Sequence, residues 1–252
     1  SSTENTTASN NTAFGGEAMK KTTTASSNTA VGTSALACNT TGATNVALGM
    51  QALKANTTGE HNTAVGHNSL LANLTANQNV AVGNYTLDAS TAGPNTAVGY
   101  CALSNVTGGA GNVAIGDLAG AQAAMINVTS ENNRAVFGNT SVTNAYVKVA
   151  FTVTSDARDK TNFGTVPHGL DFVNKLEPVS FKFKKSRDND TPHGDMRYGF
   201  KAQDIMALEG DNPVIIDNEF EDALKYKGEH LVPVLVNAIK ELTKRIKDLE
   251  DK

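Results

Sequence analysis

Tryptophan is absent from this sequence, cysteine occurs only twice, and no stretch approaches the roughly 20 consecutive apolar residues that a membrane-spanning helix needs. The two cysteines, Cys38 and Cys101, lie far apart, so we expect neither a disulfide framework nor a cysteine-based metal site, only small half-buried thiols. The histidines His168, His193 and His230 have no partner at metal-ligand spacing. We therefore expect no metal, no cofactor and no membrane insertion.

Basic residues are too few to create a positive surface. The chain of 252 residues has 21 Lys and Arg against 25 Asp and Glu, a formal net charge of −4, so we expect no nucleic-acid partner. The charges are also unevenly placed, because residues 1–150 contain only 5 of the Lys and Arg and 6 of the Asp and Glu. That first part is mostly Asn, Thr, Ala and Gly, whereas the remainder has the composition of an ordinary mixed domain.

The first part contains seven copies of the pattern Asn-[Thr/Val]-Ala-[aliphatic/Phe]-Gly, separated by 17 residues in five steps and by 16 in one. The copies begin at Asn11, Asn28, Asn45, Asn62, Asn79, Asn95 and Asn112. So regular a period is typical of stacked units, none of which can bury its apolar side alone. After Gly116 the last copy departs from the pattern, as a capping repeat does. We predict a mostly β structure here, a repetitive β-helical shaft over residues 1–120.

Alternation within a copy places the second and fourth residues on one face. We predict that the fourth residues form an inward ladder: Val31, Leu48, Val65, Val82, Val98 and Ile115. The alanine between them would face outward, where a partner chain approaches closely. The glycine suits a sharp corner and the following Ala-Leu a single helical turn. We interpret the asparagines as a ladder of side-chain amides on the turn side. Because one coil buries little apolar area, we expect a parallel homotrimer.

Over residues 11–120 the pattern resembles the β-roll heads of trimeric autotransporter adhesins and the repetitive shafts of phage tail fibres. The resemblance implies a trimeric parallel β-helix or β-roll and leaves its winding open. Residues 121–154 lose the period and end in an alternating segment over residues 145–154. We predict a long strand there, in an interwoven β stalk that joins the shaft to the C-terminal part of the chain.

The C-terminal part contains four motifs in a fixed order. They are Thr154-Ser155-Asp156-Ala157-Arg158-Asp159-Lys160, Leu176-Glu177-Pro178-Val179-Ser180-Phe181, Tyr198-Gly199-Phe200-Lys201-Ala202-Gln203 and Ala238-Ile239-Lys240-Glu241-Leu242. Each is weak alone, but together they resemble the intramolecular chaperone of endosialidases and phage tail fibres, a self-cleaving serine peptidase family. The resemblance implies an α+β chaperone and autoprotease domain over residues 155–252.

The same resemblance implies a catalytic Ser/Lys dyad that cuts the bond between Thr154 and Ser155. Ser155 would supply the nucleophilic hydroxyl and Lys160 the amine that accepts its proton. A lysine amine is normally protonated at neutral pH, so a lysine base must be desolvated or placed near another cation. Arg158 and the other chains of a trimer are candidates for that environment. Taken alone, the motif also fits a capped turn beside a solvated lysine.

A terminal helix over residues 231–252 carries a heptad seam. Its residues are Val232, Leu235, Ile239, Leu242, Ile246 and Leu249. Pro233 suits the first turn of this helix, and Arg245 and Glu250 fall at positions where they pair between chains. β-Branched residues at the first heptad position with Leu at the fourth favour parallel dimers, whereas the resembled family is trimeric. We follow the family and predict a trimeric coiled coil.

These features predict the tip of a viral tail fibre or tailspike, extracellular on the assembled virion and made in the host cytoplasm. We expect a host cell-surface receptor, a glycan or a surface protein, and an upstream virion tail component as partners. The peptidase would act once on its own chain. One alternative, a trimeric bacterial adhesin, predicts a membrane-anchoring C-terminal β segment, and the chain ends instead in a charged helix. Another, a glycan-degrading tailspike, needs paired carboxylates. The repeats offer only Glu17, Glu60, Asp88 and Asp117.

Overall fold

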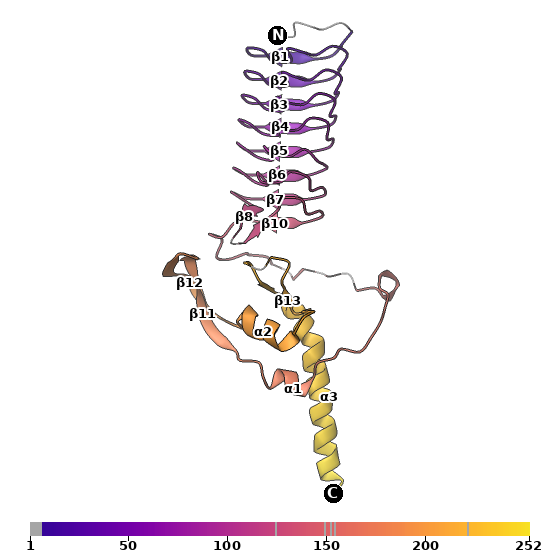
Figure 1. Cartoon of the computed structure of the whole chain (residues 1–252), viewed down its shortest axis with the longest axis vertical. Coiled ribbons are helices and arrows are strands. Elements are labelled where there is room, and N and C mark those ends of the chain that lie inside the picture. The colour runs from indigo at the N-terminus through magenta and orange to yellow at the C-terminus, as the bar shows by residue number, and fades with distance from the viewer. Residues whose placement is uncertain (1–6, 124, 149, 152, 154, 221) are drawn as a thin grey trace. The chain divides into compact units, whose positions relative to one another are not determined.

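The computed structural model describes residues 7–252 apart from residues 124, 149, 152, 154 and 221. The chain divides into two compact units, residues 1–142 and 143–252. The described part of the first unit is built from short strands and turns, and that of the second from helices and strands (Figure 1). The predicted fold class, a mostly β repetitive part followed by an α+β part that ends in a helix, is confirmed.

One strand from each coil of the first unit joins a single parallel sheet. The strands, in spatial order, are β1 (Thr12–Phe14), β2 (Thr29–Val31), β3 (Val46–Leu48), β4 (Thr63–Val65), β5 (Val80–Val82), β6 (Thr96–Val98), β7 (Val113–Ile115) and β10 (Ala135–Phe137). Equivalent residues of successive repeats are paired in register on neighbouring strands, as Ala47 is with Ala64. The unit is therefore a β-solenoid in which one repeat makes one coil.

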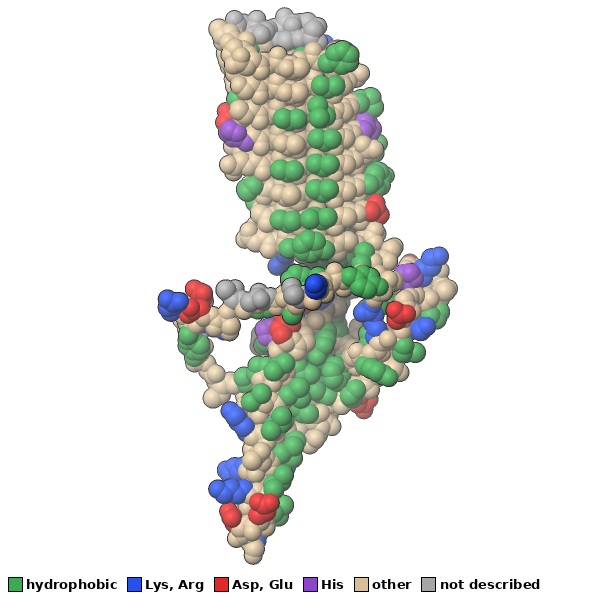
Figure 2. All heavy atoms as spheres, turned by 180° about the vertical axis from the view of Figure 1, so that it is seen from behind, with side chains coloured by type: hydrophobic (Ala, Val, Ile, Leu, Met, Phe, Trp, Pro, Cys, Tyr) green, Lys and Arg blue, Asp and Glu red, His purple; other side chains and the backbone are tan. Residues whose placement is uncertain are grey.

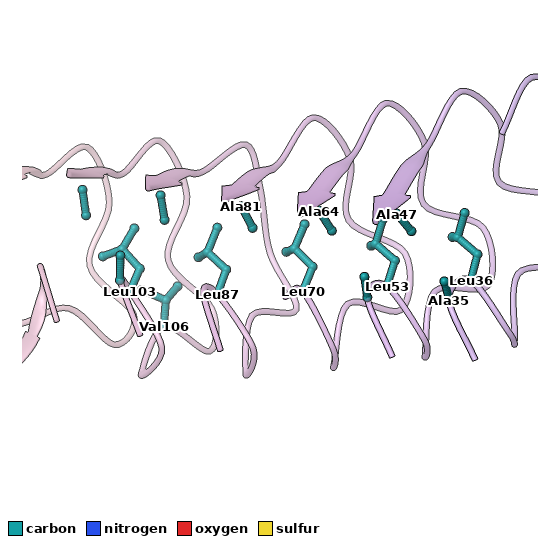
Figure 3. Close-up of a cluster of buried hydrophobic side chains, with 14 of the residues drawn as sticks. Ala35, Leu36, Ala47, Leu53, Ala64, Leu70, Ala81, Leu87, Leu103 and Val106 are labelled. Atoms are coloured by element: carbon teal, nitrogen blue, oxygen red, sulfur yellow. The ribbon is translucent and has the colours of Figure 1, made fainter. Parts of the chain in front are cut away.

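The inside and the outside of the solenoid are the reverse of the sequence-based prediction. The alanine at the second strand position is fully buried in β2 to β7, whereas Leu48, Val82, Val98 and Ile115 are exposed. Leucines from the opposite wall, such as Leu53 and Leu70, point toward these alanines and fill the core (Figure 3). The two walls lie so close that only alanine fits opposite leucine. A single chain therefore closes its own core, and the outward alanine face does not exist.

Glycines at the strand ends form the predicted corners. Gly49 has a φ of 135°, and a Cβ added to it would lie 2.5 Å from the carbonyl oxygen of Gly66 in the next coil. The predicted helical turn after each corner is absent, because Leu36 and Leu53 both have a φ of 50°. A right-handed helix needs negative φ at every residue, so these segments are turns with left-handed residues instead. Their geometry directs the leucine side chains into the core.

The predicted ladder of asparagine amides is confirmed. The Oδ1 atom of Asn62 accepts the backbone N–H of Asn79 at 2.9 Å, and the Nδ2 atom of Asn62 donates to the carbonyl oxygen of Ala76 at 2.9 Å. The same bond to the next coil recurs at the repeat asparagines from Asn11 to Asn95. A second, shorter ladder joins Asn39, Asn56 and Asn73. The buried amides of the first ladder thus both accept and donate hydrogen bonds, which ties each coil to its neighbours.

The last coil is longer than the others. The Oδ1 atom of Asn112 accepts the N–H of Arg134, 22 residues away rather than 17. The extra residues form an antiparallel pair, β8 (Ala121–Gln122) and β9 (Ile126–Asn127), before β10 resumes the main sheet. The solenoid therefore includes a strand in the range that the sequence assigned to the junction, and the departure from the repeat after Gly116 is an insertion into a coil.

The second unit has a small core under its terminal helix. Its elements are α1 (Leu170–Val173), β11 (Val179–Ser186), β12 (Asn189–Gly199), α2 (Ala202–Glu209), β13 (Ile216–Asp217), β14 (Lys225–Tyr226) and α3 (Leu231–Glu250), with 3₁₀ turns at Ala157–Asp159 and Gly228–His230. Leu231 and Val234 of α3 pack with Phe172, Ile205 and Ile216. The strands β11 and β12 form an antiparallel hairpin that is largely exposed.

Side chains of Glu209, Glu241 and Asn237 form hydrogen bonds with backbone groups of the second unit. Both oxygens of Glu209, at the end of α2, accept backbone N–H groups of residues 214–216 at 2.8–3.0 Å. Glu241 of α3 accepts the N–H of Leu170 at 3.0 Å and so caps the first turn of α1. The Nδ2 atom of Asn237 donates to the carbonyl oxygens of Val166 and His168. One face of α3 thereby fixes the segment that leads into α1.

The long strand predicted over residues 145–154 is absent from the described part of that range. Tyr146, Val147, Phe151 and Val153 are all exposed. A strand needs the backbone of a neighbouring strand for its hydrogen bonds, and the single chain supplies none to these residues. An interwoven stalk, which would take those bonds from other chains, stays a prediction.

Candidate active site

A short turn at the start of the second unit brings Ser155 and Lys160 together. Asp156 caps the 3₁₀ turn Ala157–Asp159 by accepting the N–H of Arg158 at 2.9 Å. The N–H of Lys160 donates to the carbonyl oxygen of Ala157 at 3.2 Å, which closes the turn. Because the turn reverses the chain within five residues, the lysine side chain returns to the serine that precedes it.

The two predicted dyad residues are in direct contact. The Nζ atom of Lys160 lies 2.6 Å from the Oγ atom of Ser155 and 3.3 Å from its carbonyl oxygen. The first distance is within the range across which a base removes the proton of a nucleophile. Thr154, the residue on the other side of the predicted cleavage point, lies outside the described residues. The described geometry therefore covers both side chains of the predicted dyad.

Arg158, which the sequence suggested as a candidate cation near the lysine, pairs with Asp156. Its guanidinium group forms a two-pronged ion pair with Asp156, with the shortest contact at 2.5 Å. Hydrogen bonding to Arg158 holds the pKa of Asp156 below its ordinary value, and the same contact raises the pKa of Arg158. The positive charge of Arg158 is thus paired with the neighbouring carboxylate.

Both members of the Ser–Lys pair are exposed in the single chain. The two side chains are in contact, and the rest of the single chain does not bury either of them. A lysine base is activated by burial or by a nearby cation, so burial of this pair must come from groups beyond the turn.

The predicted coiled-coil seam of α3 faces away from the core of its unit. The six seam residues are exposed, with exposed fractions from 39% for Leu235 to 68% for Leu249. Ala238, which flanks the seam, is buried and packs the helix onto its own unit. Arg245 lies 3.9 Å from Asp171 within the same chain. The helix therefore has two apolar faces, and the chain itself covers one.

The other residues considered from the sequence do not form a site among the described residues. Glu17 is paired with Lys20 at 2.9 Å, and Asp117 accepts a hydrogen bond from Asn139. No group of three or more His, Cys, Asp or Glu side chains in the described part of the chain is arranged to hold a metal. The two cysteines are free and half-buried, as predicted, and burial raises the pKa of Cys101. A thiol with a raised pKa is a poor nucleophile.

Among the described helices, none combines the length and the apolar composition that crossing a bilayer requires. The described chain is thus a β-solenoid followed by an α+β unit that contains the Ser–Lys contact.

Residues 155–213 match the Peptidase S74 family, the chaperone of endosialidase. This family is the self-cleaving intramolecular chaperone type, and the match includes the first three of the four motifs from Ser155 onward, whereas the fourth, at residues 238–242, lies beyond it. Together with the β-solenoid, the match supports a tail-fibre or spike-like protein. The match begins at Ser155 itself. No curated protein and no solved structure matches the chain.

The ion pair between Asp156 and Arg158 was not predicted from the sequence. The signal was available, because an Asp before a short turn commonly caps it through the N–H two residues on. That cap determines the shape of the turn and hence the approach of Lys160 to Ser155. The capped-turn interpretation and the dyad interpretation are therefore compatible.

Proposed function

We propose that this chain is the distal part of a viral tail fibre or spike, and that its C-terminal region assembles a parallel homotrimer and then cuts itself off before Ser155. The observation that carries the proposal is the 2.6 Å contact between the Nζ atom of Lys160 and the Oγ atom of Ser155. This contact lies at the first residue of the segment that matches the endosialidase chaperone family.

The chemistry is an acyl shift followed by hydrolysis. The neutral amine of Lys160 takes the hydroxyl proton of Ser155, and the alkoxide attacks the carbonyl carbon of Thr154. The C–N bond breaks, the released α-amine of Ser155 gains a proton, and the Thr154 carbonyl is left as an ester on the serine oxygen. Water hydrolyses this ester to give a carboxylate at Thr154 and to restore the hydroxyl. The products are residues 1–154 and 155–252, and each chain reacts once.

Assembly is the step that prepares this reaction. Both dyad residues are exposed in the single chain, so the amine needs burial by further protein before it can act as a base. The exposed seam of α3 and the exposed residues that precede Ser155 are surfaces on which other copies would pack. Cleavage then follows trimer formation, which makes it a step of maturation.

A separate chaperone is useful to a repetitive shaft. Three solenoids must find a common register before their contacts compensate for the lost chain entropy, so nucleation is slow. A compact unit that trimerises first raises the effective concentration of the shafts for one another. Once the shaft has assembled, loss of the chaperone removes the easiest pathway for dissociation of the trimer. The lifetime of the trimer is then set by its unfolding rate. The mature fibre is extracellular on the virion, where it binds a host receptor, a glycan or a surface protein, and joins an upstream tail component.

Mass spectrometry of the freshly made chain under denaturing conditions tests the cleavage. We expect fragments of residues 1–154 and 155–252 from the native sequence, and an intact chain from Ser155→Ala and from Lys160→Met. Matched controls are Ser180→Ala and Lys182→Ala, which replace exposed residues of the same types on β11 and leave processing unchanged. Normal processing of both dyad variants would remove the proposal.

A further inference from the structure

An unbroken ladder of apolar side chains runs along the outside of the solenoid sheet. It consists of the third residue of each of the eight strands, which we call the strand ridge: Phe14, Val31, Leu48, Val65, Val82, Val98, Ile115 and Phe137. All eight side chains are at least partly exposed, most of all Phe14 at one end and Phe137 at the other. Figure 2 shows a continuous column of hydrophobic side chains along the solenoid.

The residues beside the strand ridge are uncharged as well. The first position of each strand also faces outward, and it holds Thr, Val or Ala in every coil. A sheet face that meets water normally alternates with polar or charged residues, so an outward ladder that is apolar in all eight strands is a contact surface. An exposed row of β-branched and aromatic side chains is also a hazard for aggregation unless it is covered.

We propose that the strand ridge is the surface through which copies of this chain contact each other, with three ridges meeting along the axis of the trimer. This inference rests on the trimeric assembly of the proposed function. It assigns the contact to the Val, Leu, Ile and Phe positions, and not to the alanines, which the core of each chain already occupies.

The regularity of the ridge identifies another copy as its occupant. The ridge presents one apolar side chain per coil, and neighbouring coils are joined by hydrogen bonds at a fixed spacing of one repeat. A second solenoid with the same rise places an apolar side chain opposite every coil over the whole length. A globular partner or a small ligand would cover only part of the ridge.

The terminal helix supports parallel copies independently. The seam of α3 repeats with a heptad period and is exposed in the single chain, as a coiled-coil seam is before its partner helices bind. A parallel coiled coil sets identical residues of the copies at the same height. Solenoids that are also parallel and in register would bring each ridge residue to its own counterparts.

The width of the ridge suits a central axis. The ridge is flanked by threonine in half of the coils, at positions 12, 29, 63 and 96, and by Val or Ala in the others. An outward apolar face of at most two residues per coil can be buried where three such faces converge, whereas a broad sheet-on-sheet contact needs a wider apolar face.

Cross-linking tests the ridge with two positions from one coil. In a chain with Cys38→Ser and Cys101→Ser, Leu48→Cys lies on the ridge, and Met50→Cys lies two residues further on, outside it. Both original side chains are exposed, so neither change disturbs the core. A short bis-maleimide should link two chains through Leu48→Cys, which yields a covalent dimer on a denaturing gel. The Met50→Cys chain should stay single.

Lysine substitutions at the same two positions test the ridge through the stability of the trimer. Leu48→Lys should bring three ammonium groups together in an apolar strip, which is strongly unfavourable, so the trimer should dissociate or melt at a lower temperature. Met50→Lys should leave both properties unchanged.

Sedimentation separates the two possible failures. A native-sequence trimer that shows no cross-link through Leu48→Cys and no effect of Leu48→Lys would overturn the ridge and leave the proposed assembly intact. A native chain that sediments as a folded monomer would overturn both. A trimer that is cross-linked through Leu48→Cys alone supports the ridge.

Discussion

Asn62 and Asn79 are equivalent residues of adjacent coils, and the Oδ1 atom of the first accepts the backbone N–H of the second at 2.9 Å, with both residues buried. The bond recurs along the repeat asparagines, so the requirement for Asn has a physical basis. The amide of Asn62 has an acceptor oxygen for the next coil and an NH₂ group that donates to the carbonyl oxygen of Ala76 and to the Oδ1 atom of Asn45. No other side chain of similar size provides both.

Replacement of Asn62 should therefore be costly. In Asn62→Ala the buried N–H of Asn79 loses its partner, and an unsatisfied buried group costs about 1–3 kcal/mol. The matched control is Asn84→Ala, because the Oδ1 atom of Asn84 makes the same kind of bond, to the N–H of His67 at 2.9 Å, in an exposed position that water can fill. Denaturant unfolding should show a clear loss for the first variant and a smaller one for the second. Equal losses would contradict the role of burial.

Leu70 should be among the most sensitive apolar positions of the solenoid. Its side chain is fully buried opposite the alanine wall, and truncation of such a leucine costs about 2–5 kcal/mol. Leu74→Ala, four residues further on, removes the same atoms from an exposed site and should have little effect. Thermal unfolding of the two variants compares them directly. If Leu74→Ala were the more harmful change, the inward placement of Leu70 would be wrong.

Gly66→Ala should destabilise the solenoid at one corner. Gly66 has a φ of 134°, and an added Cβ would lie 2.4 Å from the carbonyl oxygen of Gly83. Backbone strain alone costs on the order of 1–3 kcal/mol for a residue with a side chain there, and the overlap adds to it. The control is Gly108→Ala, where an added Cβ meets nothing within 4 Å. Circular dichroism during heating should show a lower melting temperature for Gly66→Ala only.

Glu131 should make the last coil sensitive to acid. Burial alone would raise the pKa of its carboxyl group, but hydrogen bonds from the N–H groups of Thr129, at 2.6 Å, and Ser130 outweigh burial, and the pKa is lowered. A lowered pKa in the folded state means that the carboxylate stabilises the fold above its unfolded pKa, and that this contribution is lost as pH falls through the folded value.

The pH dependence can be isolated with Glu131→Gln. At neutral pH the variant should melt at a lower temperature than the native chain, and the difference should shrink as the solution is acidified below the ordinary range of a glutamate. A difference that stayed constant, or that grew in acid, would show that the charge of Glu131 is not what stabilises the turn.

The repeat, its strands, its glycine corners and its asparagine ladder could be predicted from the sequence, because each depends on a residue type that few other residues can replace. Which face of each strand points into the core could not be predicted. Alternation shows that Ala64 and Val65 face opposite sides, but which side is inside depends on the distance to the opposite wall, and that distance depends on where Leu70 lies. The left-handed φ of the leucines, which no propensity indicates, placed Leu70 in the core.

For the candidate site, the two dyad residues were predicted from their place among four ordered motifs, and the structure brings their side chains together. The pairing of Arg158 with Asp156 was not predicted, although a carboxylate two residues away is a strong partner for a guanidinium. The strand expected before Ser155 is not formed by one chain in the residues that the structure describes. The partner of Arg158 and the missing strand both depend on which groups lie nearby in three dimensions, and a local sequence pattern does not show this.

Native mass spectrometry of the freshly purified chain tests the central claim most directly, because it reports stoichiometry and cleavage together. We predict a complex of three chains, each cut between Thr154 and Ser155, and a complex of three whole chains for Ser155→Ala. A folded, uncut monomer from the native sequence would contradict this claim.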